Sequence, residues 1–195
     1  YPAEHALETT VIYGIDADLI MLSINHLPIC PQLFLYRETP HFIQSISSEL
    51  EPNVTYLLDI PALAQTITDE VVHGGVHDYI FLCFLLGNDF LPHFPSVNIR
   101  TGGIEKLLEA YQRTIVVGQS LTKRNMNMNM NTNATSLSID WEQLHKLVSY
   151  LALKEEEHMK GETKLRDKKE FRYKSQQTQL KNDKIENSAF ALEKE

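Results

Sequence analysis

Cysteines and long apolar runs are scarce in this sequence, and their scarcity narrows the class of protein. Only two cysteines, Cys30 and Cys83, are present, and they lie far apart. This spacing indicates neither a disulfide-stapled secreted domain nor a C-x-x-C zinc site. No run approaches the roughly 20 apolar residues that cross a bilayer, and the first residues carry no signal-peptide pattern. We therefore expect no membrane segment and an intracellular location, in the cytoplasm or the nucleus.

Basic residues are also scarce, except near the end of the chain. Residues 154–195 hold 11 Lys or Arg and 10 Asp or Glu, which leaves 7 basic and 16 acidic residues for residues 1–153. The resulting net charge of −9 in that larger part disfavours direct phosphate contacts, which need Lys and Arg. The exception is a site where carboxylates hold divalent cations, because the metal then supplies the positive charge that meets a phosphate.

The sequence does contain the mixture of predicted strands and helices that is typical of an α/β domain. Residues 10–15 are a short, continuously apolar run, as expected of a strand buried on both faces of a parallel sheet. Residues 32–38 and 54–59 are predicted as further strands. Helical spacing and capping residues predict five helices: 19–25, 61–72, 79–86 with Asp78 as its cap, 104–111, and 141–153 with Asp140 as its cap.

Two parts of the chain differ in composition. Residues 1–153 are predicted to form the α/β body. Within this body, the Asn-Met repeat at residues 125–133 is of low complexity and is predicted to be a disordered insertion. Residues 154–195 are almost entirely charged or polar and are predicted to be an exposed helix or a disordered tail.

Two aspartates follow the first predicted strand, in the segment Gly14-Ile15-Asp16-Ala17-Asp18. Carboxylates at the C-terminal end of a strand face the crevice where open α/β sheets bind their ligands. Two charges this close repel each other unless cations neutralise them. The alternative is that one aspartate caps the next helix while the other is solvated, and the tripeptide alone leaves both interpretations open.

A third aspartate follows a predicted helix that is apolar almost all round, in Leu86-Gly87-Asn88-Asp89. Such a helix is expected to be buried, so that its end carries Asn88 and Asp89 from the core toward a crevice. Gly-Asn-Asp is also good turn chemistry, which gives Asp89 a purely structural alternative. For the nearby His93, a hydrogen-bonded structural role is favoured over a ligand role.

Taken together, these two segments resemble the XRN-type 5′→3′ exoribonucleases. The resemblance is carried by Gly-Ile-Asp-Ala-Asp-Leu-Ile-Met-Leu at residues 14–22 and by Phe-Leu-Cys-Phe-Leu-Leu-Gly-Asn-Asp-Phe-Leu-Pro-His at residues 81–93. A strand ending in Arg37-Glu38 and a glycine before a helix that ends near Tyr111 extend the match, which covers roughly residues 10–155. The resemblance implies a PIN-like or flap-nuclease-like parallel-sheet nuclease domain with a helical C-terminal extension.

The resemblance also implies a metal-dependent hydrolase. Asp16, Asp18 and Asp89 stand at the family's metal-ligand positions and are the expected catalytic residues. They would help to hold two Mg²⁺ or Mn²⁺ ions, for which oxygen ligands are suited. The expected reaction is hydrolysis of the phosphodiester bonds of RNA that carries a 5′-monophosphate, and the sequence does not identify the residues that bind this RNA. For Asp78, a capping role is favoured over metal contact.

The sequence departs from the family at its beginning. In the family, an upstream segment adds further carboxylates and a basic helix that binds the 5′-phosphate, and it carries a Glu-Gly-Glu-His-Lys motif. Only Glu4-His5 faintly resembles that motif here. We therefore expect an upstream N-terminal half of the same domain as a partner, and little activity from this chain alone.

Two other functions remain open at this point. One is a catalytically incomplete pseudonuclease or interaction module with the same fold. The other is a phosphatase-like α/β enzyme that uses the Asp-x-Asp pair on small phosphate esters, which would leave the Gly-Asn-Asp segment unexplained.

Overall fold

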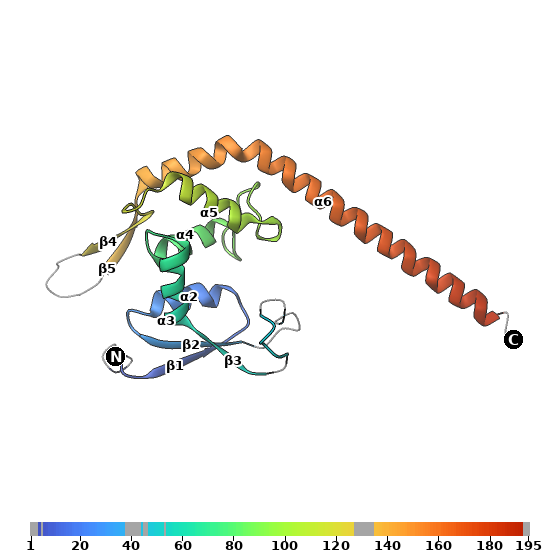
Figure 1. The fold of residues 1–195 in the computed structure, drawn as a ribbon, viewed down its shortest axis with the longest axis horizontal. Helices are drawn as coiled ribbons and strands as arrows, with labels where there is room; N and C mark the ends of the chain where they lie inside the picture. The colour runs from blue at the N-terminus through green and yellow to red at the C-terminus, as the bar shows by residue number, and fades with distance from the viewer. Residues whose placement is uncertain are drawn as a thin grey trace.

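The computed structural model describes residues 4, 6–37, 44, 47–52, 54–126 and 135–192. Their elements form a small sheet with helices packed on it, followed by a helical part from which one long helix extends (Figure 1). A single cluster of buried apolar side chains joins the two parts. It includes Leu33 and Leu35 from the sheet and Leu107, Tyr111 and Leu147 from the later helices.

The sheet has three strands in the order β1-β2-β3: Thr9–Tyr13, Gln32–Arg37 and Tyr56–Asp59. β1 and β2 are parallel, whereas β2 and β3 are antiparallel. The expected parallel sheet is therefore wrong for β3. Parallel neighbours need a long crossover, usually helical. α2 (Asp18–His26) lies within the β1–β2 connection, while the connection to β3 carries Pro40 and Pro52 and no helical pattern in its sequence.

Among the described residues, helices cover one face of the sheet. α2 and α3 (Ile60–Thr66) pack against β2 on that face, and Leu33 and Leu35 are buried there. The expectation of a first strand buried on both faces is wrong, because β1 is an outer strand whose residues alternate between half-buried and exposed. The opposite face, which we call the open sheet face, presents residues of all three strands: Val11, Tyr13, Phe34, Tyr36 and Leu57.

The helical part begins after α3 with a π-helical turn, Ile67–Val71, and continues through α4 (Val76–Leu85), a 3₁₀ turn (Ile99–Thr101) and α5 (Gly103–Thr114). α4 packs against α5, and α5 packs against α6 (Figure 1). α4 starts earlier than the sequence predicted, and Gly75 rather than Asp78 occupies its cap position. α4 is also less buried than its apolar sequence suggested, since 38% of Phe84 is exposed.

A β-hairpin that the sequence analysis did not predict precedes the last helix. β4 (Thr122–Met126) pairs antiparallel with β5 (Thr135–Ile139). Asn125 and Met126, which were assigned to a disordered insertion, are therefore strand residues paired with Ser136 and Thr135. The rest of that predicted insertion, residues 127–133, lies outside the described residues.

The last helix, α6, runs from Trp141 to Leu192 and continues without a break past the predicted boundary at residue 154. Its first part lies along α5, and its last part extends away from the other elements (Figure 1). Of the two structures left open for residues 154–195, the helix is the one observed as far as Leu192. Among the described residues, no helix is both long and apolar enough to cross a membrane.

Candidate functional site

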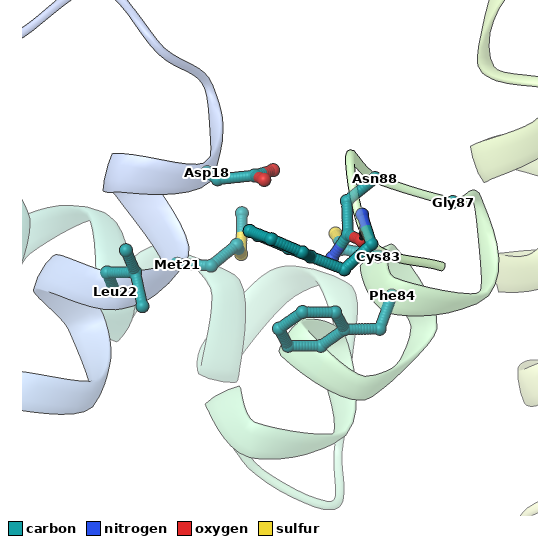
Figure 2. Close-up of a pocket in the computed structure, with 8 residues that line it drawn as sticks. Asp18, Met21, Leu22, Cys83, Phe84, Gly87 and Asn88 are labelled. Atoms are coloured by element: carbon teal, nitrogen blue, oxygen red, sulfur yellow. Dashed lines mark hydrogen bonds between the residues drawn. The ribbon is translucent and has the colours of Figure 1, made fainter. Parts of the chain in front are cut away.

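A pocket of about 200 Å³ lies between α2 and α4 and brings the two predicted motifs together. α2 contributes Asp18, and the turn after α4 contributes Gly87 and Asn88. Figure 2 shows the Asp18 carboxylate pointing across the pocket toward the side of Asn88. The remaining walls are largely apolar, formed by Met21, Leu22, Cys83, Phe84 and Phe90. The pocket is therefore an apolar recess with a carboxylate at its edge.

Asp16 and Asp18 have different environments at the start of α2. One carboxylate oxygen of Asp16 accepts a hydrogen bond from the backbone N–H of Asp18 at 3.1 Å, so Asp16 stabilises the start of the helix from an exposed position. Asp18 is half-buried and lines the pocket. Ala17 occupies the cap position of α2 without a side-chain cap bond, so the alternative in which one aspartate caps the helix and the other is solvated is wrong in that form. Asp16 bonds the first backbone N–H of the helix, while Asp18 lines the pocket.

The turn after α4 depends on Gly87 and Asn88. Gly87 has φ +84°, and a Cβ there would lie 2.6 Å from the backbone nitrogen of His93, so this position requires glycine. The Asn88 side-chain oxygen accepts hydrogen bonds from the backbone N–H groups of Phe90 and Leu91, at 2.9 and 2.8 Å. The turn is thus held by its asparagine, and not by the following aspartate.

Asp89 lies exposed in this turn, and its carboxylate accepts no hydrogen bond in the part of the chain that the structure describes. It does not line the pocket beside Asp18. The ring of His93 donates from Nδ1 to the backbone oxygen of Phe94 at 2.7 Å, and Asn98 reaches Nε2 at 3.5 Å. His93 therefore has the structural role that its sequence context favoured.

Cys83 lines the pocket but is not equipped to act as a nucleophile. Burial raises the pKa of the Cys83 thiol to about 11, and a hydrogen bond with Tyr79 only partly opposes this. The pKa of Tyr79 is raised to about 12, first by burial and then by its interaction with Cys83. Both groups are thus neutral at physiological pH, and the carboxylate of Asp18 is the charged side chain of the pocket.

The residues present fit a divalent metal only in part. Mg²⁺ and Mn²⁺ prefer oxygen ligands, and Asp18 offers a carboxylate of this kind. A second carboxylate, that of Asp16, is two residues away in sequence. Within the described ranges, however, no group of three or more His, Cys, Asp or Glu side chains is close enough to hold a metal ion. The described residues therefore supply an incomplete ligand set, and no reaction step can be derived through a metal held by them alone.

Asp78 is fully buried and holds a hydrogen-bond network that the sequence analysis missed. The backbone N–H groups of Leu121 and Thr122 each donate to its carboxylate at 2.9 Å. The hydroxyl groups of Tyr111, Ser120 and Thr122 also donate to it, each at 2.8 Å. Neither the predicted cap role nor a metal role applies, because the carboxylate is turned toward the segment that leads into the hairpin.

The Asp78 network also fixes the loop before α4. Tyr111 accepts a hydrogen bond from the backbone N–H of Gly74 at 2.9 Å. A Cβ on Gly74 would lie 2.2 Å from the Asp78 carboxylate and 2.5 Å from the Tyr111 hydroxyl, so no larger residue fits. Burial, followed by the hydrogen bond and charge of Asp78, raises the pKa of Tyr111 well above its usual value. This part of the molecule is a rigid support for α4, one wall of the pocket.

A second buried carboxylate, Glu162, joins α6 to α5. It accepts hydrogen bonds from Thr101 and, at 3.1 Å, from the ammonium group of Lys106. Burial alone would raise the pKa of Glu162, but the hydrogen bonds from Thr101 and Lys106 and the Lys106 charge outweigh it, so the pKa lies below its usual value. Lys169 further donates to the backbone oxygen of Arg100 at 3.3 Å. The charged segment of α6 is therefore partly docked.

Comparison with known families gives a match to the Xrn1 helical domain over residues 72–195, which is more than half of the chain. The matched region contains α4, the Asp89 turn, α5, the hairpin and α6, and it includes the charged segment that the sequence resemblance left out. Asp16 and Asp18 lie before it.

Comparison with individual proteins gives several exoribonucleases. The chain is 30% identical over 152 residues to a 5′-3′ exoribonuclease 2 of Cryptococcus neoformans, covering 57% of this chain and 14% of that protein. It is 34% identical over 83 residues to a 5′-3′ exoribonuclease 2 homolog of Caenorhabditis elegans, covering 42% and 7%. A 41-residue match to the Drosophila melanogaster homolog is 46% identical and covers 21% and 4%. The chain thus spans a small fraction of these relatives.

Proposed function

The chain belongs to the XRN family, by its match to the Xrn1 helical domain, and on this premise we propose that it is part of a 5′→3′ exoribonuclease. Its role in this proposal is to contribute Asp16, Asp18 and Asp89 to a site that binds Mg²⁺ or Mn²⁺. The substrate is RNA with a 5′-monophosphate, and the reaction is phosphodiester hydrolysis. The relatives are named 5′-3′ exoribonucleases, and we propose the same activity for the protein to which this chain contributes.

The observation that carries the proposal is the meeting of two distant motifs at one pocket. Asp18 follows β1, and the Gly87–Asn88 turn follows α4 some 70 residues later, yet both line the same recess. Gly87 ends α4 in the left-handed conformation that glycine adopts easily, so the feature that points to a ligand is the half-buried Asp18 carboxylate beside this turn. Recesses with apolar walls and a few polar groups are typical of binding sites.

Each residue of the pocket has a role that its environment supports. Asp18 presents a carboxylate that no helix cap consumes, and the backbone bonds of Asn88 hold the Asp89 carboxylate at an exposed point of the turn. Met21, Phe84 and Phe90 line the recess at whose edge Asp18 lies, and apolar walls near a carboxylate strengthen its attraction for a cation. When bound, a pair of divalent ions supplies an activated water and neutralises the charge on the reacting phosphate.

The proposal requires residues beyond this sequence, and the open sheet face supports that requirement. Val11, Tyr13 and Leu57 on this face are 53%, 63% and 51% exposed. A sheet normally buries such side chains against a second layer. The expected upstream half of the domain provides a layer of this kind, together with the basic helix and the further metal-binding carboxylates that the family has upstream.

The test adds an upstream half from an exoribonuclease 2 relative to the purified chain, fused or in trans. We expect release of nucleoside monophosphates from 5′-phosphorylated RNA in the presence of Mg²⁺, with 5′-hydroxyl RNA cleaved far more slowly. Asp18→Asn and Asp89→Asn should each abolish the release. Asp69→Asn is the matched control, since Asp69 is exposed on a π-helical turn away from the pocket. Equal activity in all three variants would rule out the proposed ligands.

A second candidate function is the catalytically incomplete interaction module. Two observations favour it. No group of three possible metal ligands lies together among the described residues, and residues 1–153 contain few Lys and Arg. The same supplemented assay separates the two functions. If the reconstituted protein folds and binds RNA but releases no nucleotide under any metal condition, the interaction module is the better description.

A further inference from the structure

The outer part of α6 presents cations that make no ion pair within the described residues: Lys164, Arg166, Lys168, Lys169 and Arg172. Other lysines of the same helix are neutralised, because Lys154, Lys160 and Lys174 pair with Glu157, Glu156 and Glu170. The helix therefore divides its cations into a paired set and an unpaired set.

Three of the unpaired cations, Lys164, Lys168 and Arg172, lie on one stripe of the helix. Successive members of this stripe are four residues apart, which on an α-helix means a rise of about 6 Å and a turn of about 40° per step. Arg166 and Lys169 lie closer to the docked side, where the Arg166 charge acts on Glu162 and Lys169 bonds the Arg100 backbone. The stripe is directed away from the docked side, since Glu162 faces α5 and Lys169 reaches Arg100. All three side chains are exposed, and beyond the contact of Lys169 with Arg100 the helix extends away from the other elements (Figure 1).

An exposed aromatic ring lies on the same stripe. Phe171 is 73% exposed, three residues after Lys168 and seven after Lys164, which places it beside both on the helix surface. A ring that stays in water gains nothing from folding, so its apolar surface remains available for burial against a ligand. Regular cations with an interleaved aromatic ring are the combination that single-stranded nucleic acids use, through phosphates and stacked bases.

We propose that Lys164, Lys168, Phe171 and Arg172 form a binding patch for single-stranded RNA, outside the pocket. This inference rests on the proposed function. It adds a contact for the RNA substrate on α6, since residues 1–153 contain few basic side chains. The cations contact successive phosphates, and the Phe171 ring stacks on a base. RNA is favoured over an acidic protein surface because the ring between the cations offers a base a stacking partner and offers a carboxylate nothing.

The test measures binding of the full chain to a 3′-labelled, 5′-hydroxyl RNA of about 16 nucleotides by fluorescence anisotropy in EDTA at several salt concentrations. The triple variant Lys164→Gln/Lys168→Gln/Arg172→Gln should weaken binding about tenfold or more at low salt. It should also reduce the slope of log K against log salt by about 2, at about 0.7 per phosphate. Phe171→Leu should weaken binding about fivefold with the slope unchanged.

The matched control is Lys154→Gln/Lys160→Gln/Lys174→Gln, which removes the same charge from the same helix, and helix content by circular dichroism verifies that both triples fold. An equal loss of RNA affinity in both triple variants would overturn the proposed patch, because RNA would then respond to the total charge of the helix and not to these residues. Binding of an acidic peptide with the same dependence on the variants would overturn RNA as the partner. The assay contains EDTA and measures binding without hydrolysis, so a failure of the proposed catalytic function leaves this result readable by itself.

Discussion

Replacing Asp78 by asparagine tests the fully buried carboxylate that holds the hydrogen-bond network. The carboxylate receives two backbone and three hydroxyl donors, and all five are satisfied because both oxygens accept. An asparagine of the same shape has one oxygen and one NH₂ group. Whichever way it is oriented, its NH₂ faces the backbone N–H of either Leu121 or Thr122, and neither of these donors can turn away.

The magnitude follows from this count. One backbone donor left unsatisfied in a buried site costs about 1–3 kcal/mol, and the surviving bonds lose the strength that a charged acceptor gives. We expect Asp78→Asn to lower the free energy of unfolding by about 3 kcal/mol. For a chain of this size that corresponds to a fall of about 6–12 °C in the melting temperature.

Urea and thermal unfolding, followed by circular dichroism, measure the effect. Asp69→Asn is the control, because its carboxylate is exposed and, within the described part of the chain, accepts hydrogen bonds from the Gln65 side chain alone. Its effect should stay within about 0.5 kcal/mol. If Asp78→Asn changed the free energy of unfolding by less than about 1 kcal/mol, the hydrogen-bond network would not be an important support of α4.

Three further predictions concern other sites. Isolated chain should bind Mn²⁺ weakly in a calorimetric titration, and Asp16→Asn/Asp18→Asn should remove the heat that Asp69→Asn retains; identical heats would exclude these ligands. Glu162→Gln should destabilise the chain at pH 7. Because the pKa of Glu162 in the folded chain lies below its usual 4.5, the loss of stability relative to wild type should persist above pH 4.5 and shrink as the pH falls below 4.5. A loss of stability that does not change with pH would contradict this assignment. Deleting residues 127–130 should leave the melting temperature nearly unchanged because Asn-Met repetition offers no packed face, whereas also deleting Asn125 and Met126 should lower it, since both are paired in β4.

The sequence predicted those elements whose signal is local. The strands around residues 10–15, 32–38 and 54–59 and the helices of the body appear within a few residues of their predicted places, because apolar periodicity and capping residues act over short distances. The pocket, too, brings the Asp18 segment and the Gly87 turn together. Whether Asp16, Asp18 and Asp89 hold metal remains a prediction.

The missed features depend on contacts between distant residues. The hairpin strand at Thr122–Met126 includes Lys123, Arg124 and Asn125, which have little intrinsic preference for strands. The start of that strand is held by Asp78, some 44 residues earlier, and no local pattern reveals this partner. The antiparallel pairing of β3 with β2 and the ion pair of Glu162 with Lys106 were missed for the same reason, because each joins residues that are far apart in the sequence. Topology and buried polar pairing are thus decided by the assembled molecule.

The open sheet face has a consequence for handling the isolated protein. Contiguous exposed apolar surface promotes self-association, and outer strands offer further hydrogen-bonding edges to a second molecule. The net charge of −8 opposes this association through mutual repulsion, which weakens as salt is added. Light scattering of the purified chain should therefore rise with both concentration and ionic strength. Colloidal behaviour, rather than unfolding, will set the concentration range in which the chain can be studied by itself.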